Sequence, residues 1–272
     1  MFGVSLSHIT AAALTPEQLV HYVRAVSGRR ALLCAGHVLY VHEKHGVLVA
    51  YPDIDRAIRS AAPLPLTDAL NEAANICRRV TVLAPFRPTE APAHAHSRQD
   101  AHWILSLPHG PGQKLRNMLA RAGREVTVRE EIWSEEHFML VKHYLQTRAL
   151  SPGTHKIFSA LPRYAAGACP ENAPQGGNVL LLAARNNKGA LAGITLGDFS
   201  GLHTAFYMFA FHSSASPPGT ADILLRGLTR RAADMGHARM NLGLGINSGI
   251  AFFKRKWGAK PLLPHVETSW DL

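Results

Sequence analysis

Cysteine is scarce in this chain of 272 residues, which contains only Cys34, Cys77 and Cys169. Their number is odd and no two of them are spaced as C-x-x-C, which excludes a disulfide framework and a cysteine-rich zinc site. We therefore expect these residues to be reduced, small and buried, as in a cytoplasmic protein.

The chain also lacks the segments that mark membrane, secreted and dinucleotide-binding proteins. No apolar run reaches the roughly 18 residues that a membrane-spanning helix needs, and residues 1–20 lack the basic start of a secretory signal. No predicted strand leads directly into G-x-G-x-x-G, the pattern of dinucleotide sites. We expect a cytoplasmic protein without stable membrane insertion.

Clusters of metal ligands are missing as well. His94 and His96 lie in a proline-rich stretch, residues 85–99, and have no third ligand close by. Because a bound metal ion normally has three or four protein ligands, we expect no metal site.

Negative charge is in deficit, since 29 Lys and Arg face 19 Asp and Glu and leave a net charge of +10. Such an excess favours an anionic partner, for example a phosphate-rich cofactor, a nucleic acid or a lipid headgroup, although solubility alone would also explain it. Part of the excess lies on a predicted helix through Lys114, Arg116, Arg121 and Arg124, which is either an anion site or a solvated face. Since aromatic RNA-binding motifs are missing, a tRNA contact would depend on phosphate charge.

Apolar periodicity and turn residues predict a mixture of helices and strands. In the first half the helices are 15–27, 67–77 and 114–124, and the strands are 31–34, 38–42, 47–51, 80–83 and 103–107. In the second half the helices are 134–145, 155–166, 220–235 and 248–257, and the strands are 126–128, 179–185, 191–199, 204–212, 238–242 and 260–270. Both halves run through a strand meander, a helix, a strand and a final helix or strand. We predict two copies of one α/β (α+β) unit, residues 1–124 and 125–272, each a mixed, mostly antiparallel sheet flanked by helices.

Three segments of the second half resemble a known family. They are the strand 204–212, the run Gly-His-Ala-Arg-Met-Asn-Leu-Gly at 236–243, and Gly-Ile-Ala-Phe-Phe-Lys-Arg-Lys-Trp-Gly at 249–258, which is close to a G-L-x-x-F-K-x-x-F-G box. In this order they resemble the GNAT (acyl-CoA N-acyltransferase) superfamily, and more narrowly its FemAB-like tandem-GNAT transferases. The resemblance covers residues 178–270 well and the first half only by its expected architecture.

The resemblance implies transfer of an acyl or aminoacyl group from acyl-CoA or aminoacyl-tRNA to an amine by direct attack. The donor would lie against a splayed pair of strands, and its phosphates would meet the loop 213–221 at the start of a helix. The residues implied to bind the donor are Phe209, Phe211, Ser216, Gly219, Thr220, Ala221 and Phe253. The ammonium group of Lys254 would stabilise the oxyanion that forms at the donor carbonyl.

The sequence departs from this family in the donor loop and on the last helix. Ser216 stands where acetyl-CoA-binding members have Gln or Arg, and Pro217 and Pro218 have no N–H to offer a pyrophosphate. Phe252 or Phe253 occupies the place of a tyrosine that serves many GNAT enzymes as an acid. Acyl-CoA and other donors therefore both remain open.

A general base is not defined by the sequence. Asp198, His203 and His212 lie at predicted strand ends, where such enzymes often hold a base or a water relay, and any of them could instead be structural. Two other functions stay open. The chain could be a catalytically degenerate GNAT-fold module that binds an anionic ligand or a protein, or a domain that modifies lipid headgroups.

Overall fold

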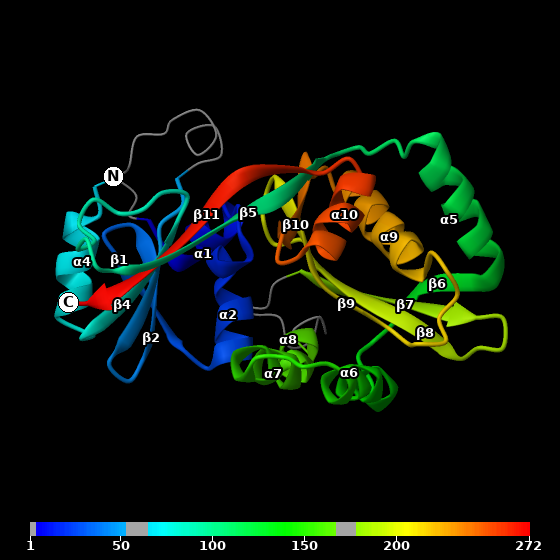
Figure 1. The fold of residues 1–272 in the computed structure, drawn as a ribbon, viewed down its shortest axis with the longest axis horizontal. Helices are drawn as coiled ribbons and strands as arrows, with labels where there is room; N and C mark the ends of the chain where they lie inside the picture. The colour runs from blue at the N-terminus through cyan, green and yellow to red at the C-terminus, as the bar shows by residue number, and fades with distance from the viewer. Residues whose placement is uncertain (1–3, 53–64, 167–177) are drawn as a thin grey trace.

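The computed structural model describes residues 4–52, 65–166 and 178–272. Its eleven strands form one sheet in the order β1-β2-β3-β4-β11-β5-β10-β9-β8-β7-β6. The sheet runs the length of the molecule, with α4 near one end and α5 near the other (Figure 1). Most neighbouring strands are antiparallel and helices flank the sheet, so the predicted α/β class and mixed sheet are confirmed.

The first half follows the predicted pattern closely. Its elements are α1 (Leu6–Ala11), η1 (Pro16–Gln18), α2 (Val20–Ser27), β1 (Arg30–Cys34), β2 (His37–His42), β3 (His45–Val49), α4 (Thr67–Ala74), β4 (Arg79–Ala84) and β5 (His96–Ser106). The helix expected at 15–27 begins as a 3-10 turn and ends at Gly28, whose positive φ of 70° suits a glycine. Two features were not predicted: α1, and the start of β5 inside the stretch expected to be a loop.

The second half was predicted with small differences at the element ends. Its elements are α5 (Gln113–Glu125), β6 (Val126–Glu130), α6 (Glu135–Thr147), α7 (Pro152–Ser159), α8 (Leu161–Ala166), β7 (Val179–Asn186), β8 (Leu191–Asp198), β9 (Thr204–His212), α9 (Thr220–Asp234), β10 (Arg239–Leu244), α10 (Ser248–Lys256) and β11 (Lys260–Asp271). The stretch expected to be helical at 155–166 divides into α7 and α8.

The two halves repeat one topology. An antiparallel meander, β1-β2-β3 or β7-β8-β9, is followed by a helix and then by a strand parallel to the last strand of the meander. The predicted boundary at 124/125 falls where α5 meets β6. The last strand crosses it, because β11 lies antiparallel between β4 and β5.

Helices bury both faces of the second half. One face packs under α5, α9 and α10 through residues such as Leu119, Leu225 and Trp257. The other packs under α6, α7 and α8 through Val141 and Tyr164, on the side where Figure 1 shows these helices below the sheet. Each fully buried side chain of this size contributes about 1.5–3 kcal/mol to the free energy of folding. The two apolar layers therefore stabilise the sheet from both faces.

Cys34 and Cys77 are buried and free, as predicted, whereas Cys169 lies outside the described residues. Across residues 4–52, 65–166 and 178–272, none of the helices combines the length and apolarity needed to cross a membrane.

Candidate active site

The parallel strands β9 and β10 form a fork. They pair at three positions, Thr204 with Arg239, Ala205 with Met240, and Phe206 with Asn241. Beyond these pairs β9 continues to His212 and β10 to Leu244. The corresponding strands of the first half, β3 and β4, stay paired over five positions. Only the second half therefore opens its parallel pair, which agrees with the splayed strands that the resemblance implied.

Bulges in both strands accompany the fork. In β9, the register against β8 moves from Phe209 to Tyr207 between adjacent β8 residues, which leaves Met208 as an extra residue. In β10, the register against β5 skips from Asn241 to Leu244, and Gly243 lies in this skip with a φ of 78°. Bulges increase strand twist and turn a strand away from its neighbour, so the two bulges account for the parting.

Asn241 fixes the point where the fork opens. Its side chain is fully buried, donates from Nδ2 to the Leu14 carbonyl at 2.7 Å and accepts at Oδ1 from the Gly243 N–H at 2.7 Å. The first bond ties β10 to the segment between α1 and η1, so the N-terminal half forms one wall of the fork.

Lys254 lies beside the β10 arm of the fork. It is 4% exposed, and its Nζ donates to the Leu244 carbonyl at 2.6 Å. Burial lowers the pKa of Lys254 to about 8, while Asp100 acts in the opposite direction. A pKa near 8 leaves the side chain mostly cationic at pH 7. The neighbouring Phe253 stacks on Tyr207 of β9, with ring centroids 6.5 Å apart, and so spans from α10 to the other arm.

The loop between β9 and α9 lines an open cavity of about 350 Å³. Predicted site residues that line it are His212, Ser216, Gly219, Thr220, Ala221 and Phe253. The structure thus brings together most of the predicted donor-binding set. The other two predicted residues, Phe209 and Phe211, do not line this cavity. Phe211 is buried on the opposite face of the sheet against Tyr144, and Phe209 packs against Tyr22.

Hydrogen bonding inside this loop uses groups that a phosphate would need. The N–H of Ser216 donates to Ser213, and both the N–H and the hydroxyl of Thr220 donate to the Pro217 carbonyl. Asp222, in the first turn of α9, is 4% exposed and accepts from Trp257 Nε1 at 2.8 Å and from Lys256 Nζ at 2.6 Å. A carboxylate there already compensates the positive end of the helix dipole, so the loop is poorly suited to a pyrophosphate.

Asp198 is part of a buried structural network. It is fully buried and accepts from the Tyr164 hydroxyl at 2.7 Å, from His21 Nε2 at 2.6 Å, and from the N–H and hydroxyl of Ser200 at 3.0 and 2.6 Å. It pairs in register with Phe206, which in turn pairs with Asn241 at the point where the fork opens.

The two predicted histidines lie at opposite ends of β9. His212 is exposed at the end that lines the donor-loop cavity, whereas His203 is exposed just before the strand. The structure therefore places only His212 at the open end of the fork.

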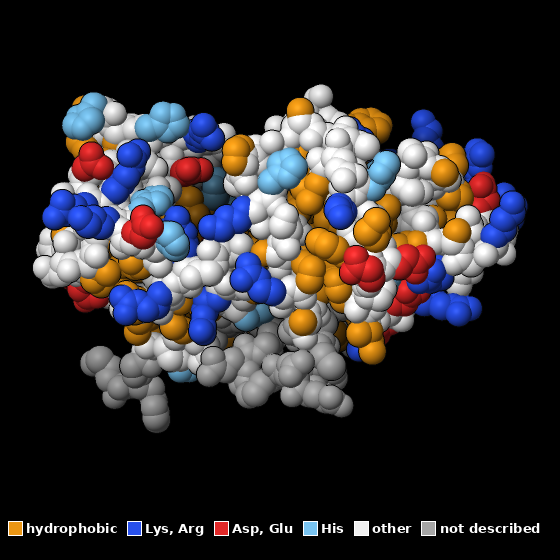
Figure 2. Space-filling view, turned by 90° about the horizontal axis from the view of Figure 1, so that it is seen from below, with side chains coloured by type: hydrophobic (Ala, Val, Ile, Leu, Met, Phe, Trp, Pro, Cys, Tyr) orange, Lys and Arg blue, Asp and Glu red, His pale blue; other side chains and the backbone are white. Residues whose placement is uncertain are grey.

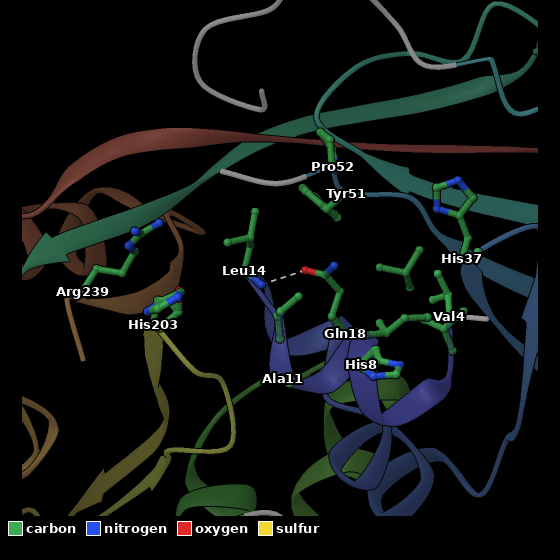
Figure 3. Close-up of a pocket in the computed structure, with 17 residues that line it drawn as sticks. Val4, His8, Ala11, Leu14, Gln18, His37, Tyr51, Pro52, His203 and Arg239 are labelled. Atoms are coloured by element: carbon green, nitrogen blue, oxygen red, sulfur yellow. Dashed lines mark hydrogen bonds between the residues drawn. The ribbon is translucent and has the colours of Figure 1, made fainter. Parts of the chain in front are cut away.

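Two further cavities were not predicted. One, of about 430 Å³, is lined mainly by apolar residues of both halves, with Arg239 and His203 at one end and His8 and His37 at the other (Figure 3). A second, of about 650 Å³, is lined by His21, Arg24, Ala25, Gly28, Arg29, Arg30, Ala31 and Arg163, without a carboxylate. The net charge indicated an anionic partner, and seven of the eight lining residues come from the single stretch 21–31, to which the fold adds Arg163.

Basic side chains also gather elsewhere on the surface. Figure 2 shows Lys and Arg at the end of the molecule where α5 lies. On that helix Lys114, Arg116 and Arg124 are exposed, and Arg121 pairs with Glu125 at 3.5 Å. Among the side chains that the structure describes, no three His, Cys, Asp or Glu are grouped as metal ligands.

Comparisons with known proteins identify the fold. No family model matches the sequence, and no curated protein matches it. FemX is 11% identical, over 100% of this chain and 97% of its own, with a TM-score of 0.62. The C-terminal domain (DUF2156) of a provisionally named lysylphosphatidylglycerol synthetase from Agrobacterium fabrum is 13% identical, over 97% and 90%, with a TM-score of 0.60. A tandem GNAT protein from the clavulanic acid biosynthesis pathway is 14% identical, over 86% and 78%, with a TM-score of 0.51.

These likenesses show the fold and nothing finer, because the identities are low. The chain has a tandem GNAT fold that it shares with FemX, and the predicted resemblance is confirmed at that level.

Proposed function

We propose that this chain transfers an acyl or aminoacyl group from an activated donor to an amine. The observation that carries this proposal is the fork between β9 and β10 with the buried Lys254 beside it. The tandem GNAT fold supports the proposal in general terms, because the resemblance implies that a donor lies against a splayed pair of strands.

In this reaction the donor carbonyl enters the open end of the fork. The uncharged amine attacks the carbonyl carbon, a C–N bond forms, and the oxygen becomes an oxyanion. Collapse of the intermediate breaks the C–S or C–O bond to the leaving group. The Lys254 ammonium, held against Leu244 by one hydrogen bond, stabilises the oxyanion. A fixed donor of this kind is worth about 3–4 kcal/mol of transition-state energy.

Among the two donor classes we favour an aminoacyl-tRNA over acyl-CoA. The donor loop contains two prolines and a buried Asp222, and these features oppose pyrophosphate binding. The cavity lined by Arg24, Arg29, Arg30 and Arg163 supports an anionic donor held through phosphate charge. This function fits the cytoplasmic location predicted from the cysteines and needs no metal.

A second candidate is a binding module that has lost catalysis. The same loop features favour it, together with Phe252 and Phe253 in place of a tyrosine on the last helix. Such a module would hold an anionic ligand without transferring any group.

Transfer to hydroxylamine separates the two candidates, because this acceptor is already uncharged at pH 7. Purified protein is incubated with acetyl-CoA, a long-chain acyl-CoA or total aminoacyl-tRNA, and hydroxamate is measured above the uncatalysed rate. We expect formation from at least one donor, and at least a 100-fold loss in Lys254→Met because the oxyanion loses its cation.

Lys188→Met, on an exposed hairpin, is the matched control and should keep the wild-type rate. The melting temperature of Lys254→Met should stay within a few degrees. An active Lys254→Met would remove this residue from the mechanism, and no acceleration by the wild type with any donor would favour the binding module.

A further inference from the structure

Amide formation needs a proton acceptor, because an aliphatic amine is cationic at pH 7 and cannot attack until it loses a proton. Of the residues predicted for this task, Asp198 is occupied by four hydrogen bonds. His203 precedes β9 at the closed end of the fork, and His212, at the open end, is exposed on the rim of the donor loop.

Glu17 is a carboxylate that the N-terminal half brings to this region. It lies in η1, three residues after Leu14, whose carbonyl holds Asn241 at the point where the fork opens. Gln18 stabilises this turn, since its Oε1 accepts from the N–H groups of Leu14 and Thr15 at 2.8 and 3.2 Å, the first shown in Figure 3. The Tyr40 hydroxyl donates to the Glu17 carbonyl at 2.8 Å and fixes the backbone.

The Glu17 side chain is only partly satisfied. It is 28% exposed, yet its Oε2 is buried and has no hydrogen-bond partner. A buried carboxylate oxygen without a donor is costly, which indicates that a donor is supplied by something else during function. A further carboxylate near the fork, Asp100, is already occupied by the N–H groups of Ala101, Gly245 and Ile246.

His102 connects Glu17 to the β10 arm. Its Nε2 lies 3.9 Å from Glu17 Oε2, its side chain is 1% exposed, and neither ring nitrogen has a hydrogen-bond partner. On β5 it stands opposite Leu244, the residue whose carbonyl accepts from Lys254. Glu17, His102 and Lys254 therefore form a line of titratable groups from η1, through β5, to α10.

Behind this line lies a pair of fixed aromatic side chains. Tyr51 and His265 bond each other at 2.6 Å, and the His265 ring packs edge-on to His102 at 5.2 Å. This pair holds the His102 ring in place and leaves its nitrogens unsatisfied.

We propose that Glu17 accepts the proton of the acceptor amine at its buried and unpartnered Oε2. This inference rests on the proposed function. The ammonium N–H bond breaks and its proton goes to Glu17, while the freed electron pair forms the C–N bond to the donor carbonyl. The second amine proton leaves as the intermediate collapses, and the thiol or hydroxyl leaving group takes it up.

Two acceptors of different charge test this role. Glu17→Gln keeps the shape of the side chain and removes its basicity. With methylamine, which is cationic at pH 7, we expect the variant to lose at least 100-fold of the wild-type rate. With hydroxylamine, which needs no deprotonation before attack, we expect a loss of less than about fivefold. Lys254→Met should lose both reactions, because the oxyanion forms in each.

Glu72→Gln is the matched control, since Glu72 is exposed on α4 at the far edge of the first half. It should leave both rates unchanged. An equal loss with both acceptors would mean that Glu17 is structural, and no loss with methylamine would mean that it is not the proton acceptor; either result overturns the inference. If the wild type transfers to neither acceptor, the proposed function itself fails.

Discussion

Lys254 and Asp198 are both buried charged residues of the second half, yet their surroundings differ. Asp198 accepts four hydrogen bonds and holds α2 and α8 to the sheet through His21 and Tyr164. Lys254 donates one hydrogen bond, to the Leu244 carbonyl at the open end of the fork. A charge that is buried and weakly paired is able to act on a ligand, whereas a saturated one stabilises the fold.

His102 should make the stability of the protein sensitive to acid. Burial lowers its pKa to about 4, with His265 and Lys254 adding to the shift and Glu17 and Asp100 opposing it. In the unfolded chain histidine titrates near 6.5. The unfolded state therefore binds a proton first, and the free energy of unfolding falls as the pH drops from about 6.5 to 4. For this group the loss is about 3 kcal/mol.

Urea unfolding at pH 7, 5.5 and 4.5 measures this effect. The pH slope should be flatter in His102→Leu than in the wild type, because Leu does not bind the proton. His212→Leu, at an exposed position, should keep the wild-type slope. Equal slopes for His102→Leu and the wild type would contradict the assignment.

At the scale of elements, the first turn of α9 carries the carboxylate of Asp222. A helix that binds phosphate leaves the N–H groups of its first turn free for the anion. Replacing Asp222 by Asn removes the negative charge and releases Lys256, while Trp257 Nε1 retains an oxygen acceptor. The interaction of one charge with a helix N-terminus contributes about 0.3–1 kcal/mol of free energy. We therefore expect Asp222→Asn to bind coenzyme A about two- to fivefold more tightly than the wild type in calorimetry.

Asp234→Asn is the control for this helix, because Asp234 lies at the exposed opposite end. Its affinity for coenzyme A should equal that of the wild type. Weaker binding by Asp222→Asn would show that this carboxylate does not oppose phosphate.

The same pair of elements has different geometry in the two halves. The strands β3 and β4 pair regularly, whereas β9 and β10 each carry a bulge and part. Two local insertions in the ladder thus distinguish a closed structural unit from one that can admit a ligand.

At the scale of the whole molecule, β11 joins the two halves into one sheet. Leu263, Val266 and Trp270 of this strand are buried, and together they contribute roughly 5 to 9 kcal/mol. This equals much of the stability of an ordinary domain. A chain that ends at Ala259 should therefore fail to fold in either half, as judged by circular dichroism and urea unfolding.

Removal of Leu272 alone is the control, since this residue is 41% exposed. That shorter chain should unfold in one cooperative transition like the wild type. Native-like unfolding of the chain that ends at Ala259 would show that the two halves fold without the shared strand.

Local pattern was sufficient for the elements and the repeat. The spacing of apolar residues, the Asn186–Gly189 turn and the glycines that end helices predicted nearly every strand and helix, because such features act within a few residues. The Phe253–Lys254 pair was also selected from sequence, since a short segment carries its resemblance, and its role in the reaction stays a prediction. The tertiary structure alone decided which distant residues meet. Three features depend on contacts between distant parts of the chain: the pairing of β11 with the first half, the parting of β9 and β10, and the position of Glu17 near His102. Such contacts produce no pattern among neighbouring residues, so local pattern alone does not predict them.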